Sequence, residues 1–148
     1  MAGVKRMSLE SLIAGADALH MGQSRLDADH QRLLALVSRV SRVDLSQLSG
    51  DEFAELLSDF ADYAYRHFDE ERDWMRAIGY PDAAAHEALH DVMVERVGEI
   101  CMAVMEARPE ARDALRTLLV DLFVAHLDTA DRALAAFARE RGGVAHAP

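Results

Sequence analysis

The segment HEALH, residues 86–90, places two histidines four positions apart with a glutamate directly after the first. On a helix this is the H-E-x-x-H pattern of zinc proteases, in which both histidines bind the metal and the glutamate is the general base. Read as H-x-x-x-H, it is a pair of imidazoles one helical turn apart that other metals could use. The metzincin extension of the protease pattern fails, because Met93 and Arg96 replace its glycine and third histidine.

Histidines and acids recur at helical spacing elsewhere in the chain. Of the seven histidines, five lie in predicted helices, in four motifs: Asp27-x-x-His30, His67-x-x-x-Glu71, His86-x-x-x-His90 and His126-x-x-x-x-Asp131. Residues four apart share one face of a helix, so such a pair can point two side chains at one place. His126 and Asp131 are five apart, which separates them by roughly 140° on a regular helix. We therefore predict a π-bulge between them, since such bulges occur often at functional sites.

The number of candidate ligands favours two metal ions over one. Five imidazoles and two carboxylates exceed the four ligands of zinc but suit two six-coordinate ions bridged by the carboxylates. If Glu71, Asp131 and a solvent-derived oxo or hydroxo group all bridge, each ion has three oxygens. Three histidines then complete the six-ligand coordination of one ion. The other ion has only two histidines, so one of its six coordination positions stays open. That position predicts a site for a small exogenous molecule.

Composition limits the function classes. The 148 residues suffice for one domain, and 28% charged residues with a mean hydropathy of -0.08 argue against membrane insertion. Polar residues interrupt any signal-peptide core near Lys5 and Arg6, so we expect a cytoplasmic protein. The single Cys101 cannot form an internal disulfide, and a net charge of -10 argues against nucleic-acid binding.

The periodicity predicts an all-α protein. Ala, Leu, Glu, Arg and Met dominate, and no sustained alternation indicates a strand, so the substrate-binding edge strand of a zinc protease is not expected. Short connections between long helices favour an antiparallel up-down-up-down four-helix bundle, with a monomer as the simplest state. We expect an N-terminal arm over 1–25 with a short helix in SLESLIAGADAL, a bundle over 26–140 and a flexible tail over 141–148. The predicted helices span 26–43, 51–79, 82–107 and 109–140.

Over about residues 26–134 the chain resembles the hemerythrins, specifically the single-domain bacterial members. The resemblance is strongest in HFDEERDWMRAIGYPDAAAHEALH, residues 67–90, and extends to LDADHQRL around His30 and HLDTAD around His126. All seven ligand positions of the family are filled. The chain departs from many members at Leu122, where they have Trp, and at Arg72, where they have a second Glu.

The resemblance implies two non-haem iron ions that bind molecular oxygen reversibly, for delivery, storage or sensing. It assigns His86, His90 and His126 to one iron, His30 and His67 to the other, and Glu71 and Asp131 as bridges. Oxygen would bind the iron with two histidines, and from the spacing we place Leu122, Phe123 and Leu127 nearest the apolar pocket. Ligation rich in imidazole favours oxygen binding over oxygenation. A di-iron oxidase, peroxidase or nitric-oxide-handling enzyme, or an iron or zinc reservoir, remains the alternative.

Overall fold

The computed structural model describes residues 9–145, which contain helices and turns but no strand, as the all-α prediction requires. Three long α-helices are followed by a composite fourth helix, residues 111–145, in which π-helical turns interrupt the α-helix. The elements after the arm are α2 (Ser24–Arg42), η2 (Leu45–Gln47), α3 (Gly50–Ala77), α4 (Ala83–Met105), α5 (Ala111–Thr117), η3 (Leu118–Phe123), α6 (Val124–His126), η4 (Leu127–Asp131) and α7 (Arg132–Ala145).

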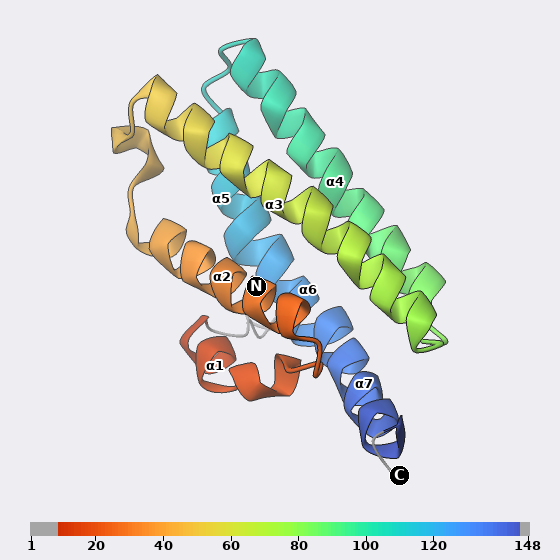
Figure 1. The fold of residues 1–148 in the computed structure, drawn as a ribbon. Coiled ribbons are helices and arrows are strands. Elements are labelled where there is room, and N and C mark those ends of the chain that lie inside the picture. Colours follow the sequence, from red (N-terminus) through yellow and green to blue (C-terminus); the bar gives the residue numbers. More distant parts are fainter. Residues whose placement is uncertain (1–8, 146–148) are drawn as a thin grey trace, which may run out of the picture.

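The four long helices form the expected bundle. Successive helices run in alternating directions, with α3 and α4 side by side and the fourth helix packed against α2 and α4 (Figure 1). The predicted boundaries agree with the observed ones to within two residues, except that α7 continues to Ala145 rather than ending at 140. None of the described helices has the length and apolar composition that a membrane span requires.

Local sequence determines where α3 begins and ends. Ser49 and Glu52 form a capping box: the Glu52 carboxylate accepts the Ser49 amide at 2.7 Å and the Ser49 hydroxyl accepts the Glu52 amide at 3.0 Å. At the other end Gly79 adopts a left-handed φ of 69°, and the Tyr80 amide donates to the Met75 carbonyl at 2.9 Å. This Schellman motif reverses the chain and thereby sets α4 beside α3.

The fourth helix contains the distortion predicted from the spacing of His126 and Asp131. A π-helical turn spans Leu127–Asp131, and its wider i→i+5 hydrogen bonding brings residues five apart onto one face. This turn is what lets both side chains face the interior of the bundle. A second π-helical turn, Leu118–Phe123, was not predicted.

The N-terminal arm lies over the end of the bundle where α2 begins and α7 ends (Figure 1). It contains α1 (Leu9–Ala14), which confirms the short helix expected there, and the 3₁₀ turn η1 (Ala16–Leu19). The side chains of Leu12 and Leu19 are buried. The Arg139 guanidinium donates to the carbonyls of Ala18 at 3.1 Å and His20 at 3.2 Å. The predicted arm residues 1–8 and tail residues 146–148 lie outside the described residues.

Candidate metal centre

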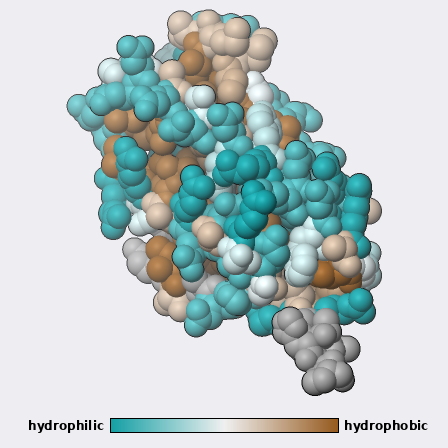
Figure 2. All heavy atoms as spheres, in the orientation of Figure 1, coloured by the Kyte–Doolittle hydropathy of each residue, from teal (hydrophilic) through white to brown (hydrophobic). Residues whose placement is uncertain are grey.

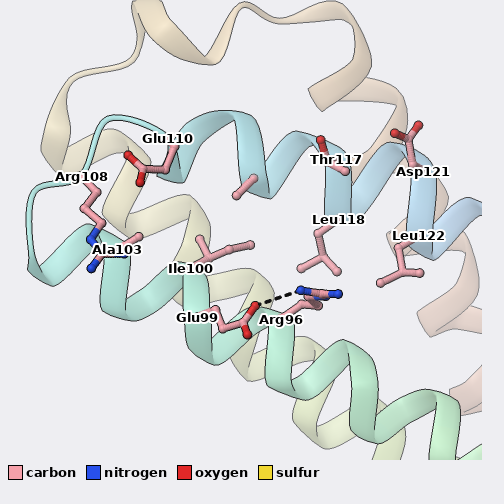
Figure 3. Close-up of a pocket in the computed structure, with 11 residues that line it drawn as sticks. Arg96, Glu99, Ile100, Ala103, Arg108, Glu110, Thr117, Leu118, Asp121 and Leu122 are labelled. Atoms are coloured by element: carbon pink, nitrogen blue, oxygen red, sulfur yellow. Dashed lines mark hydrogen bonds and ion pairs between the residues drawn. The ribbon is translucent and has the colours of Figure 1, made fainter.

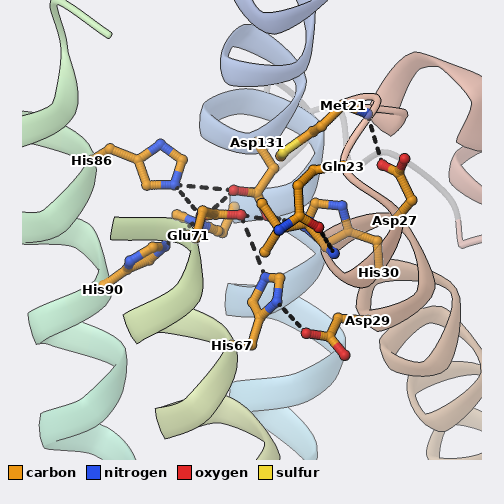
Figure 4. Close-up of polar contacts among 12 residues, drawn as sticks. Met21, Gln23, Asp27, Asp29, His30, His67, Glu71, His86, His90 and Asp131 are labelled. Atoms are coloured by element: carbon orange, nitrogen blue, oxygen red, sulfur yellow. Dashed lines mark hydrogen bonds and ion pairs between the residues drawn. The ribbon is translucent and has the colours of Figure 1, made fainter. Parts of the chain in front are cut away.

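The seven predicted metal ligands meet in the interior of the bundle, although they come from four helices. Figure 4 labels six of them, all except His126. Each is buried, with at most 6% of its surface exposed. Their donor atoms fall into two adjoining groups, each compact enough to hold a metal ion. One group consists of Glu71, His86, His90, His126 and Asp131, and the other of His30, His67 and Glu71.

The carboxylate of Glu71 lies between the two groups and divides its oxygens between them. Oε1 is 2.7 Å from Nε2 of His86 and 2.9 Å from Nε2 of His90. Oε2 is 3.4 Å from Nε2 of His67 and 3.5 Å from Nε2 of His30. A carboxylate placed in this way can bind a different metal ion with each oxygen.

Asp131 is arranged in the same way on the opposite helix. Its Oδ1 is 3.1 Å from Nε2 of both His86 and His126, whereas its Oδ2 is 3.4 Å from Nε2 of His30. Asp131 therefore also reaches both groups of histidines. All five imidazoles present Nε2 to the centre, so Nδ1 of each ring faces away from it.

Without metal, neighbouring carboxylates favour the protonated form of three of the histidines, His30, His67 and His86. Burial alone would lower the pKa of His30, but the neighbouring carboxylates of Asp131 and Glu71 outweigh burial and raise it to about 10. The same competition raises the pKa of His67 and of His86 to about 9. Burial prevails at His90, whose pKa is lowered. For Glu71 the surrounding histidines overcome burial and hold the pKa well below its usual range.

Several donor atoms of the centre are buried at ion-pair distance from one another but without a hydrogen bond of suitable geometry. They are Nε2 of His30, His90 and His126, Oε2 of Glu71 and Oδ1 of Asp131. Such atoms are costly to bury unless something binds them. All of them point into the centre, and imidazole nitrogens with carboxylate oxygens are donors that iron accepts. The residues present therefore fit a pair of metal ions.

Asp29, which was not among the predicted site residues, contacts the centre from behind His67. Its Oδ2 lies 3.1 Å from Nδ1 of His67, and the Tyr63 hydroxyl donates to the Asp29 backbone carbonyl. The Tyr63 ring lies parallel to the His67 ring, with 5.6 Å between their centroids. Burial would raise the pKa of Asp29, but His67 outweighs it, so the pKa is lowered and the group is a carboxylate. Such a partner orients a ligand histidine and increases its basicity.

No sequence pattern pointed to Asp29, because it is adjacent to His30 along the chain and therefore faces a different side of α2. Only the packing of α2 against α3 brings it to His67, 38 positions away. Within the described residues His67 is the one member of the five whose outward nitrogen has a carboxylate partner.

Aromatic side chains pack against the centre on the side of His90. Phe68 stacks on His90, with ring centroids 4.0 Å apart and planes inclined by 13°, and Phe123 stacks on Phe68 at 5.8 Å. Phe123 and Leu127 are buried in the bundle. Leu122 is half-buried and lines a surface groove to which no histidine of the centre contributes. The roles of these three residues toward oxygen remain predictions.

The fold and the site define an all-α bundle protein with an interior centre of five histidines and two carboxylates. The chain belongs to the hemerythrin family: the model of the hemerythrin HHE cation binding domain matches residues 21–138.

Curated relatives agree with this membership. A bacteriohemerythrin of Stenotrophomonas maltophilia is 29% identical over 125 residues, which cover 84% of this chain and 80% of the relative. Bacteriohemerythrins of Ralstonia nicotianae and Campylobacter jejuni are 28% and 22% identical, covering 88% and 83% of this chain and 92% of each relative. No solved structure showed significant similarity to the chain.

Proposed function

We propose that this protein binds molecular oxygen reversibly at two non-haem iron ions held in the bundle interior. The observation that carries the proposal is the position of Glu71 and Asp131, whose oxygens are divided between a group of three histidines and a group of two. His86, His90 and His126 would hold one iron, His30 and His67 the other, and the two carboxylates would bridge them. Membership in the hemerythrin family supports iron as the metal.

The unequal division of histidines determines where a ligand can bind. With both carboxylates and one solvent oxygen shared between the ions, the side with His86, His90 and His126 would offer six donors and the side with His30 and His67 would offer five. A ferrous pair would supply two electrons and one open coordination position for oxygen on the side of His30 and His67. Neutral imidazoles stabilise high-valent iron less than carboxylates do, which favours binding and release over oxygenation.

The protein's own residues would hold the centre in one geometry and limit access of water. Asp29 orients His67 from outside, and Phe68 holds the ring of His90 by stacking. Phe123, whose ring stacks on Phe68, and Leu127 are both buried within the bundle. An apolar surrounding of this kind would limit the access of water and protons to the centre, which favours reversible binding.

The test is an iron count combined with the visible absorption spectrum. The protein is reduced without oxygen, exposed to air and then degassed. Two irons per chain, with a charge-transfer band that appears in air and disappears on degassing, are expected. A band that never reverses while a substrate is consumed would instead identify an oxidase or peroxidase, and zinc or no metal would refute the di-iron proposal.

A further inference from the structure

A surface hollow of about 190 Å³ lies between α2 and α3. In the space-filling view, apolar atoms are visible between α2 and the first half of α3, surrounded by hydrophilic atoms (Figure 2). The apolar residues that line the hollow are Leu33, Leu36, Leu56, Phe60 and Tyr63, and the charged ones are Arg32, Arg39 and Asp59. A mainly apolar lining with a few charged groups is typical of a site for a small molecule.

The two arginines of the hollow are exposed, and among the described residues neither forms an ion pair. The guanidinium of Arg32 lies over the Tyr63 ring, 5.7 Å from its centroid. This contact uses the face of the guanidinium and leaves its N–H groups free to bind an acid. Asp59 also lines the hollow but pairs with neither arginine. Two positive charges against one negative charge make the lining locally positive in a chain whose net charge is -10.

The arginines of the larger groove between α4 and the fourth helix are arranged differently (Figure 3). There the guanidinium of Arg96 binds Glu99 at 3.2 Å, and that of Arg108 binds Glu106 at 2.9 Å. Both cations of that groove therefore already have an acid beside them. The hollow between α2 and α3 is the one of the two whose cations can still bind an anion.

The spacing of Arg32 and Arg39 indicates a ligand with an acid at each end. The two residues are seven positions apart on one helix, which corresponds to about 10 Å along its axis. Each guanidinium can bind one carboxylate through two parallel hydrogen bonds. Leu33 and Leu36, which lie between the arginines along the chain, offer an apolar surface to a chain of methylene groups. The small volume suits a short ligand rather than a drug-sized one, whose pockets are about 300–1,000 Å³.

We propose that the hollow between α2 and α3 binds a short aliphatic dicarboxylate, with one carboxylate on Arg32 and the other on Arg39. Tyr63 both lines the hollow and lies parallel to His67, so the ligand would lie one side chain away from the candidate metal centre. None of the seven candidate metal ligands lines the hollow, so binding does not depend on metal or on oxygen.

The test is isothermal titration calorimetry of the purified protein with glutarate and with pentanoate, in which a methyl group replaces one of the two carboxylates. One glutarate per chain should bind with a dissociation constant of about 1 mM or lower, and pentanoate should bind at least about tenfold more weakly. Arg32→Gln and Arg39→Gln should each raise the dissociation constant of glutarate at least about tenfold, because each removes one charge-assisted pair. In either variant glutarate should bind no more tightly than pentanoate, since its second carboxylate then has no partner.

Arg96→Gln is the matched control, because Arg96 is an exposed arginine on α4 outside the hollow. It should leave both dissociation constants unchanged, and all variants should keep the helical circular dichroism of the wild type. A wild-type chain that shows no saturable binding of glutarate up to about 10 mM would overturn the proposal. So would equal binding of glutarate and pentanoate by the wild type, or single variants that bind glutarate as the wild type does.

Discussion

For the proposed pair of metal ions, the hydrogen bond between Asp29 and His67 predicts which ion is lost first when the centre is weakened. Asp29 is a buried carboxylate, 3.1 Å from Nδ1 of His67, and no other described residue holds that nitrogen. Loss of such an outer partner typically weakens metal affinity by about 10- to 100-fold. Because only the group of His30 and His67 depends on this contact, the loss should fall on one metal ion.

Two substitutions separate the charge of Asp29 from its hydrogen bond. Asp29→Asn keeps an oxygen that can accept from Nδ1 but removes the charge, and a hydrogen bond to a neutral acceptor is about half as strong. We expect affinity at the two-histidine side to fall about tenfold, or ~1.4 kcal/mol. Asp29→Ala also leaves a buried N–H unpaired, so the loss should approach about 100-fold, or ~2.7 kcal/mol.

The assay is an anaerobic chelator titration that counts the metal retained per chain. The wild type should release its two ions over a narrow range of chelator, whereas both Asp29 variants should pass through a plateau with one ion bound. Asp62→Asn, an exposed change on α3, is the control and should titrate like the wild type. Equal weakening of both ions, or full retention in Asp29→Ala, would refute the assigned role of Asp29.

Three further predictions concern the same centre. Glu87→Gln should leave the metal content unchanged in elemental analysis, because Glu87 lies outside both ligand groups. Glu71→Ala and Asp131→Ala should each reduce the metal content to one ion or none. Metal loss in Glu87→Gln would contradict this. The metal-free protein should lose thermal stability as pH rises from about 7 to 10, because the folded pKa values of His30 (about 10), His67 and His86 (about 9) exceed the ordinary 6.5. Their contribution is fully present below pH 6.5 and disappears through pH 9 to 10, so a calorimetric melting temperature that rises over this range would be inconsistent with it. Tyr63→Phe should lower metal affinity by less than about threefold in the same chelator titration. The change removes a hydrogen bond to the Asp29 backbone but keeps the ring stacked on His67. A plateau like that of Asp29→Ala would instead show that the Tyr63 hydroxyl positions Asp29.

The sequence alone determined the helices and the candidate ligands, because both depend on short-range spacing. The start of α3 is marked by the hydrogen bonds between Ser49 and Glu52. Its end is marked by the left-handed backbone conformation of Gly79, two residues before Pro81. The five-residue interval from His126 to Asp131 indicated a π-helical turn because no regular helix could align the two side chains.

Only the tertiary structure decided how these elements meet. The approach of Asp29 to His67, and the division of each carboxylate's oxygens between two groups of histidines, depend on the angles and offsets between helices. The groove between α4 and the fourth helix, which Leu122 lines, likewise depends on how these two helices pack. Helical periodicity specifies which residues share a face, whereas contacts with the other helices determine what that face meets.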